Sequence, residues 1–308
     1  MAHDHGHGHS HAPANFGRAF AIGIALNITF VVIEAVYGRL SNSLALVADA
    51  GHNLSDVLGL VLAWGASVLA RRHPTLRRTY GLRRSSILAA LLNAVVLLVA
   101  VGGIAWEALR RFGNPEPTAG GTVIVVAAIG IAVNGGTALL FMAGRKGDLN
   151  IRGAFLHMAA DAGVSLGVVL AGLAILATGR AWLDPAVSLA IVVVIVVGTW
   201  GLLRDSVNLA LDAVPEGIDM AAVQGYLGSL PAVVEVHDLH VWGMSTTETA
   251  LTAHLVMPDT TCDDATLSRI CGELHDRFGI EHTTLQVESG DPAHPCSCSL
   301  VPAYAQAV

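Results

Sequence analysis

The sequence contains few charged residues, and those it has are unevenly distributed. Asp, Glu, Lys and Arg make up 13% of its 308 residues, whereas an ordinary soluble domain contains about 25%. Residues 16–212 are mostly Ala, Val, Leu, Ile and Gly, while residues 213–308 have the composition of a soluble protein. The shortage of charge argues against a soluble core for the first region and favours a membrane domain. We expect no cleavable signal peptide, because the N-terminus is polar and His-rich, not basic and then apolar.

Long apolar runs define the first region. A membrane-spanning helix needs roughly 20 mostly apolar residues, and we predict an α-helical membrane protein with six such helices. They lie near residues 16–38, 43–70, 84–111, 119–144, 152–178 and 183–211.

The loops between these runs differ in positive charge, which predicts orientation. The loop at 71–84 contains six Arg, and the loop at 144–152 adds two Arg and one Lys. The loops on the other side together carry only Arg39, Arg110, Arg111 and Arg180. Because the more basic loops face the cytoplasm, we expect both termini there. Compact loops and a short tail favour an integral protein of a bacterial inner membrane.

Three parts follow along the chain. Residues 1–15 form a polar tail with five His at alternate positions, which cannot pack a core. Residues 16–212 are the predicted transmembrane domain. Residues 213–308 begin at "DAVPEG", whose Pro and Gly mark a break before a cytoplasmic domain.

The cytoplasmic domain is predicted to be an α+β open-faced sandwich in the order α-β-β-α-β. Its helices are expected at 219–230 and 263–278, and its strands at 233–242, 249–257 and 281–288. Alternation along a strand puts Leu251, Ala253, Leu255 and Met257 on one face and Thr252 and His254 on the other. The same rule places Glu288 opposite Leu285 and Val287. His254 and Glu288 are therefore expected on a face that aliphatic side chains do not fill.

Two apolar runs carry the same polar pair, "HNLSD" at 52–56 and "HMAAD" at 157–161. Residues four apart share one helix face, so His52 and Asp56 project together, as do His157 and Asp161. Ionisable residues at membrane depth are costly and usually face an interior or a water-filled path. A single pair is also compatible with a hydrogen bond between helices. Two pairs at identical spacing favour a metal site.

The ligand types predict which ion such a site binds. Two imidazoles and two carboxylates match tetrahedral Zn²⁺, with Cd²⁺ or Co²⁺ as further cargo, whereas an all-oxygen set favours Mg²⁺ or Mn²⁺. A site placed among membrane helices favours transport over a structural role. Protons compete for the same ligands, so a proton gradient can drive release of the metal. The sequence has no G-x-x-x-x-G-K-[ST] loop, which argues against ATP as the energy source.

Several longer motifs resemble the cation diffusion facilitator family, specifically its zinc-transporting branch. The resemblance covers residues 16–290, and the motifs stand in the family's order: "LNITFVVIEAVYGRLSNSLALVADAGHNLSD" at 26–56, "YGLRRSSILAALLNA" at 80–94, "HMAADAGVS" at 157–165, "LDPAVSL" at 183–189 and "VHDLHVW" at 236–242.

The resemblance implies a homodimeric six-helix zinc/proton antiporter that exports metal by alternating access. It places the transport ligands on His52, Asp56, His157 and Asp161, the four residues that the spacing selects. Asn27 and Asn134 match polar positions near that site, or else bond between helices. Asp49 lies near the path, and Glu34 and Glu107 are expected to be interfacial or paired. A further zinc site in the cytoplasmic domain matches His237, His240, His254 and Glu288.

The four cysteines are Cys262, Cys271, Cys296 and Cys298, all in the region expected to be cytoplasmic, where disulfides are rare. Some relatives have a tail Cys pair that joins the N-terminal His segment on another ion, so Cys296 and Cys298 are candidate ligands. The family's metal site in the loop after the second helix is not expected here, because this loop has only His73. Ser86 replaces an acidic residue common in the family.

Two rival functions stand beside export. A membrane metallohydrolase is disfavoured, because H-E-x-x-H is missing and four ligands leave no position for a catalytic water. A membrane-anchored metal sensor or scaffold without transport predicts that loss of Asp161 leaves zinc tolerance intact. The expected partners are a second copy of the chain, the lipid bilayer, zinc ions and protons, with no nucleic acid.

Overall fold

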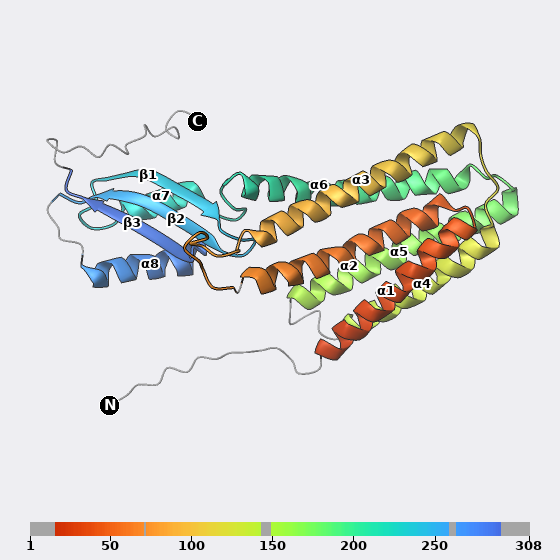
Figure 1. Cartoon of the computed structure of the whole chain (residues 1–308), viewed down its shortest axis with the longest axis horizontal. Coiled ribbons are helices and arrows are strands. Elements are labelled where there is room, and N and C mark those ends of the chain that lie inside the picture. Colours follow the sequence, from red (N-terminus) through yellow and green to blue (C-terminus); the bar gives the residue numbers. More distant parts are fainter. Residues whose placement is uncertain (1–15, 71, 143–148, 259–262, 291–308) are drawn as a thin grey trace. The chain divides into compact units, whose positions relative to one another are not determined.

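Six long helices fill residues 16–210 of the computed structural model, which describes residues 16–70, 72–142, 149–258 and 263–290 (Figure 1). Each predicted apolar run coincides with one of them to within about three residues. Their bounds are α1 Phe16–Leu40, α2 Leu44–Ala70, α3 Ser85–Gly113, α4 Gly120–Met142, α5 Leu149–Thr178 and α6 Leu183–Ala210.

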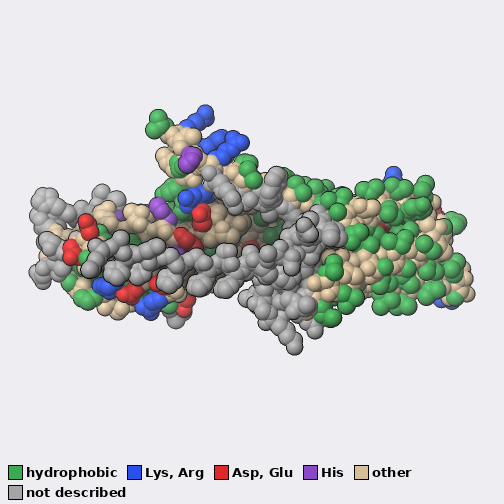
Figure 2. All heavy atoms as spheres, turned by 90° about the horizontal axis from the view of Figure 1, so that it is seen from below, with side chains coloured by type: hydrophobic (Ala, Val, Ile, Leu, Met, Phe, Trp, Pro, Cys, Tyr) green, Lys and Arg blue, Asp and Glu red, His purple; other side chains and the backbone are tan. Residues whose placement is uncertain are grey.

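Four stretches of helix are long and apolar enough, by length and composition within the described residues, to cross a membrane: Ser85–Gly113, Gly120–Leu140, Phe155–Thr178 and Leu183–Ala210. Many of their large apolar side chains are exposed, among them Val99 and Val197 at 72% and 71%. Hydrophobic side chains also cover the helical surface in Figure 2. Such surfaces suit lipid, so the helical part is a membrane domain.

The chain divides into two compact units, which are described separately. The first contains Met1–Leu60 and Val95–Thr199, and the second contains Val61–Ala94 and Trp200–Val308. The first unit is held by buried aliphatic side chains around Phe30, Leu46 and Val101. Asp184, at the start of α6, is buried and accepts hydrogen bonds from Ser43 Oγ and, at 2.7 Å, from the Leu44 backbone N–H. Asp184 thereby satisfies backbone groups that open α2.

The second unit contains the predicted α-β-β-α-β order: α7 Met220–Gly228, β1 Glu235–Gly243, β2 Thr249–Val256, α8 Asp264–Phe278 and β3 His282–Glu288. The strands form one sheet in the order β1-β2-β3, with β1 antiparallel and β3 parallel to β2. Both helices pack on one face, where Leu227 of α7 and Leu274 of α8 join Leu251 and Leu255 in the core. The predicted faces of β2 are confirmed.

Strand β1 contains an irregularity that the alternation rule does not predict. His237 pairs with His254 but His240 pairs with Thr252, so three residue steps on β1 match two on β2. Asp238 has a φ of +50° at this point, and Asp is among the residues that tolerate this conformation. The bulge brings His237 and His240 to the same face of the sheet, although odd spacing would separate them.

Candidate metal centres

The two His–Asp pairs of the membrane domain meet in the first unit. His52 and Asp56 project from α2, and His157 and Asp161 project from α5. His52 Nε2 lies 3.4 Å from Asp161 Oδ1 and 3.9 Å from Asp56 Oδ2. His157 Nε2 lies 3.3 Å from Asp56 Oδ2 and 3.6 Å from Asp161 Oδ2. All four residues selected by spacing therefore face one another across the two helices.

These separations have a chemical meaning. Zinc bonds of about 2.0–2.3 Å put the donor atoms of a tetrahedral site about 3.3–3.7 Å apart. A direct N–H···O hydrogen bond is shorter, at about 2.9 Å. The distances of 3.3–3.9 Å between the His and Asp atoms therefore fit donors arranged around an ion better than residues bonded to each other. His52, Asp56 and Asp161 form a group whose ligand atoms all lie within 4.8 Å of one another, and His157 stands outside this group.

Burial differs across this cluster. The Asp161 side chain is 2% exposed, whereas that of His157 is 43% exposed. Three polar atoms of the cluster are buried and have no hydrogen-bond partner among the described residues: His52 Nδ1, Asp56 Oδ2 and Asp161 Oδ2. Unsatisfied buried polar atoms are rare and costly. Two of them are carboxylate oxygens that face His157, so a cation at this place would satisfy them.

A second layer of polar residues lies beside the cluster. Ser165 Oγ donates to Asp49 Oδ2 at 3.2 Å, and Asn53 Nδ2 donates to Glu34 Oε2 at 3.2 Å. Asp49 and Glu34 are both 0% exposed. Neither belongs to a group of converging ligands among the described residues. They are buried polar partners of the helices that carry the cluster.

The remaining membrane residues singled out in the sequence have separate surroundings. Asn27 Nδ2 donates weakly to Met158 Sδ at 3.6 Å, beside His157 in the chain. Asn134 is fully buried, and its amide bonds to no other described residue. Glu107 is paired, as expected, with Arg110 and Arg111, each at 3.2 Å.

A second cluster lies on the open face of the sheet in the second unit. His254 Nδ1 is 2.7 Å from Glu288 Oε1, and His237 Nε2 is 3.3 Å from Glu288 Oε2. The rings of His237 and His254 lie 5.0 Å apart. The three side chains are only 10–16% exposed, and their ligand atoms converge within 4.8 Å. Two imidazoles and a carboxylate are a donor set that suits Zn²⁺.

Asp238 joins this cluster and was not foreseen from the sequence. Its Oδ2 lies 3.5 Å from His254 Nε2, and its Oδ1 lies 3.0 Å from His240 Nε2. His240 itself is half exposed and stands outside the group of three. The bulge turns the Asp238 side chain toward the histidines. The position of Asp238 between two His in "VHDLHVW" is the sequence feature that could have predicted its place in the cluster.

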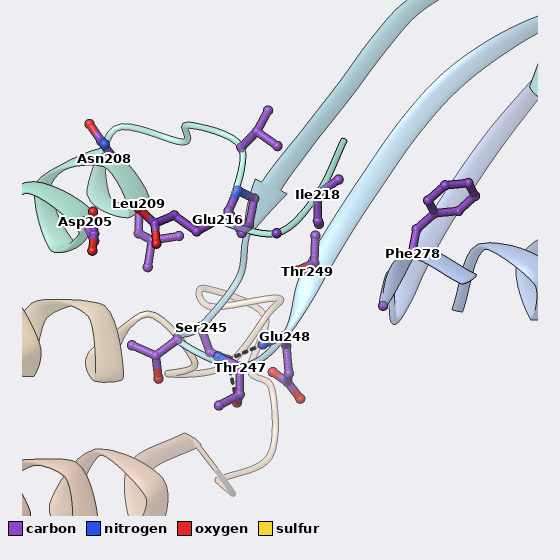
Figure 3. Close-up of a pocket in the computed structure, with 15 residues that line it drawn as sticks. Asp205, Asn208, Leu209, Glu216, Ile218, Ser245, Thr247, Glu248, Thr249 and Phe278 are labelled. Carbon is purple, nitrogen blue, oxygen red and sulfur yellow. Dashed lines mark hydrogen bonds between the residues drawn. The ribbon is translucent and has the colours of Figure 1, made fainter. Parts of the chain in front are cut away.

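A separate pocket of about 380 Å³ lies in the second unit, at the end of α6, the 214–218 segment and the β1–β2 turn (Figure 3). In that turn Ser245 Oγ accepts hydrogen bonds from the backbone N–H groups of Thr247 and Glu248. Two of its carboxylates point to arginines, since Glu216 pairs with Arg204 and Glu248 with Arg83. The pocket contains no histidine, and its carboxylates do not converge on one point.

Three predicted features lie outside the described residues: the His-rich tail at 1–15, Cys262, and the pair Cys296 and Cys298. Cys271 is a free cysteine.

Two family models match the chain. The model described as the cation efflux transmembrane domain covers residues 20–209. The model described as the cytoplasmic domain of cation efflux proteins covers residues 215–290. The chain belongs to the cation efflux family. This membership confirms the resemblance to cation diffusion facilitators, and it identifies the helical membrane domain and the sheet-containing cytoplasmic domain as the family's two parts.

Curated members of this family match most of the chain. A protein named zinc transporter ZitB from Shigella flexneri is 38% identical over 303 residues, covering 97% of this chain and 96% of the relative. A cation efflux system protein CzcD from Alcaligenes sp. is 35% identical, covering 93% and 89%. A cadmium, cobalt and zinc/H⁺–K⁺ antiporter from Bacillus velezensis is 35% identical, covering 86% of each chain. All three are named as efflux or transport proteins.

Proposed function

We propose that this chain exports Zn²⁺ from the cytoplasm in exchange for protons, by alternating access through His52, Asp56, His157 and Asp161. The observation that carries the proposal is the convergence of their donor atoms at separations of 3.3–3.9 Å. Two imidazoles favour Zn²⁺ over the hard cations that carboxylates alone select. The name of the Shigella relative supports zinc, and that of the Bacillus relative adds Cd²⁺ and Co²⁺ as cargo.

Proton coupling follows from the chemistry of the ligands. Neutral imidazole and ionised carboxylate bind metal, and protonation of either displaces it. A histidine with an ordinary pKa near 6.5 changes charge within the physiological range. Entry of protons into the cluster from the acidic side would therefore release the ion there. The Bacillus relative's name includes both H⁺ and K⁺, so transport has to be measured with a gradient of each ion.

The architecture proposed for this activity is the one predicted from the sequence. Six transmembrane helices in residues 16–212 follow a His-rich tail at 1–15 and precede a cytoplasmic domain at 213–308. Two copies form the working dimer, in a bacterial inner membrane with both termini in the cytoplasm. The family's cytoplasmic domain and the bacterial sources of the relatives support this arrangement.

Transport in proteoliposomes tests the function. The full chain is reconstituted, a proton gradient or a potassium gradient is imposed, and ⁶⁵Zn²⁺ uptake is measured for the wild type and Asp56→Asn. We expect uptake driven by the proton gradient, and its loss in the variant, because an amide oxygen cannot replace the anionic ligand. Glu107→Gln is the matched control, since it makes the same chemical change in the membrane domain away from the cluster.

Two outcomes would overturn the proposal. Uptake that Asp56→Asn leaves unchanged would remove the cluster from the path. A reconstituted protein that binds zinc but moves none under either gradient would favour the alternative, a membrane-anchored metal sensor or scaffold without transport.

We also propose that the cytoplasmic cluster binds a zinc ion with a regulatory role, held by His237, His254 and Glu288 and supported by Asp238 and His240. Calorimetric zinc titration of the full chain, in the Asp56→Asn background, tests this site separately from transport. We expect His254→Ala to remove one binding event and Asp238→Asn to weaken it, while the exposed His275→Ala changes nothing. A binding count that His254→Ala does not alter would contradict the site.

A further inference from the structure

The segment between α2 and α3 is exposed and rich in arginine. Residues 72–80 are all exposed. Farther along, Arg83 pairs with Glu248 at 3.3 Å, and Arg84 pairs with Asp212. Arg72, Arg77 and Arg78, by contrast, form no ion pair with any residue that the structure describes. The segment itself contains no Asp or Glu and a single His, His73.

This segment has a defined shape. The backbones of Thr75 and Arg78 exchange two hydrogen bonds of 3.0 Å each, which makes Leu76 and Arg77 the tip of a tight turn. Gly81, with a φ of +71°, passes so close to Arg72 that a Cβ there would lie 3.2 Å from the Arg72 carbonyl oxygen. The Leu76 side chain at the tip is fully exposed. Basic, histidine and apolar side chains gather on a projecting lobe in Figure 2.

Contacts within the second unit place the segment on the side of the cytoplasmic domain. The Tyr80 ring meets the His282 ring edge-on at 5.8 Å. The Ser86 hydroxyl accepts a hydrogen bond of 3.1 Å from the Thr246 backbone N–H. The segment starts where α2 ends at Ala70 and leads into α3, which is long and apolar enough to cross the membrane. In the topology proposed above, on which this inference rests, its exposed tip faces the cytoplasmic surface of the bilayer.

We propose that residues 72–80 form a docking site for the anionic phospholipid head groups of the cytoplasmic leaflet. Guanidinium groups bind phosphate through paired hydrogen bonds, and basic residues beside a membrane span are attracted to an anionic leaflet. Leu76 stands between these charges, where an apolar side chain can enter the interface. Charge complementarity with the anionic leaflet, which the proposed topology puts beside this loop, favours lipid over an acidic protein segment.

Hydrogen–deuterium exchange of the full chain in lipid nanodiscs tests the proposal locally. One set of nanodiscs contains phosphatidylcholine alone, and the other contains phosphatidylcholine mixed with phosphatidylglycerol. We expect the backbone amides of residues 75–80 to exchange more slowly in the anionic bilayer, and high salt to abolish the difference because it screens the charges.

Two variants separate charge from shape. Arg77→Gln with Arg78→Gln is expected to lower the affinity of the loop for the anionic surface about thirtyfold, since each arginine near such a surface contributes about a factor of five. Leu76→Ser is expected to reduce the protection of the loop amides from exchange in the anionic bilayer. The protection that remains should still depend on salt. Arg269→Gln with Arg277→Gln, on the exposed face of α8 where both arginines pair with Glu273, removes the same charge elsewhere and should leave the loop protected.

Equal exchange in the two bilayers would overturn the proposal. Protection that is equally strong in pure phosphatidylcholine and survives Arg77→Gln with Arg78→Gln would also overturn it, because it would assign the loop to a protein contact instead.

Discussion

At the scale of single residues, the two clusters use the same chemistry but differ in readiness for a metal. The membrane donors of His52 and Asp161 stand 3.4 Å apart, too far for a good hydrogen bond and suitable for a shared ion. In the cytoplasmic cluster, His254 and Glu288 approach to 2.7 Å and are bonded to each other. A metal there must first break that bond, so we expect the cytoplasmic cluster to bind zinc more weakly.

We expect the imidazoles of the membrane cluster to set the metal selectivity of the proposed transport site. Replacing His52 with Asp leaves one imidazole and three carboxylates, a harder set that favours Mn²⁺ relative to Zn²⁺. We expect His52→Asp to lower zinc uptake in proteoliposomes about tenfold or more, a change of about 1.4 kcal/mol, and to admit Mn²⁺ in competition assays. His275→Asp, on the exposed face of α8, is the control. Zinc preference unchanged in His52→Asp would mean that selectivity is set elsewhere.

Spacing alone was enough to select His52, Asp56, His157 and Asp161, because i and i+4 positions meet on any regular helix. The spacing rule did not predict Asp238 as a member of the cytoplasmic cluster, because Asp238 lies at a β-bulge where the alternation of side chains along the strand is interrupted. Ser86 had no explanation from sequence. The structure supplies one, because its hydroxyl accepts the Thr246 backbone N–H where the cytoplasmic domain meets α3.

At the scale of elements, helix positions were predictable and side-to-side packing was not. Apolar runs that end at charged or Gly- and Pro-containing loops mark α2 and α3 within a residue or two. Nothing in the sequence says which small residues touch. Gly120 and Gly172 do: a Cβ on Gly172 would lie 2.7 Å from Ile124 Cγ1 and 3.2 Å from the Gly120 carbonyl oxygen. Small residues permit such close approach of membrane helices.

Two Gly→Ala variants of α5, one at the contact with α4 and one away from it, are expected to change stability in opposite directions. Gly172→Ala forces atoms apart, and overpacking costs about 1–3 kcal/mol, so we expect a lower melting temperature in detergent. Gly167→Ala lies on the same helix with no neighbour within 4 Å. It should be neutral or stabilise by up to about 1 kcal/mol through helix propensity. Equal effects of the two variants would contradict the packing described for α5.

The start of α8 depends on a single carboxylate. Asp263 hydrogen-bonds with Thr266, whose backbone N–H donates to Asp263 Oδ1 at 2.8 Å, and these bonds lower the pKa of Asp263. A lowered pKa in the folded state means that the stabilisation is complete above the unfolded pKa of about 3.9 and is lost as pH falls through the lower folded value.

We therefore expect Asp263→Ala to lower the melting temperature of the cytoplasmic domain at neutral pH, followed by circular dichroism of the full chain, and the deficit to shrink below that pKa. Asp264→Ala removes a neighbouring negative charge but leaves the Asp263 N-cap in place, so it should lower the melting temperature less. The reverse order would show that charge near the helix, and not the cap, stabilises α8.

At the scale of the whole molecule, polar contacts join the ends of membrane helices to the cytoplasmic domain within the second unit. Arg84 at the start of α3 pairs with Asp212 just after α6, and Arg83 pairs with Glu248 of the β1–β2 turn. That turn ends β1, the strand that carries His237 and the bulge at Asp238. The strand that carries His237 is therefore continuous in sequence with the turn whose Glu248 pairs with Arg83, the residue before Arg84.

Reversal of the Arg84–Asp212 pair tests whether this junction matters for transport. Both side chains are 52% exposed, and exposed pairs contribute only about 0–1 kcal/mol to stability. We expect Arg84→Asp or Asp212→Arg alone to slow zinc uptake in proteoliposomes with little change in melting temperature, because like charges push the ends of α3 and α6 apart. The double reversal should restore uptake, since the attraction returns with opposite polarity. The Arg269 and Glu273 reversal within α8 is the matched control and should leave uptake unchanged in all three forms. If the single variants transport zinc normally, the Arg84–Asp212 ion pair is not required for transport.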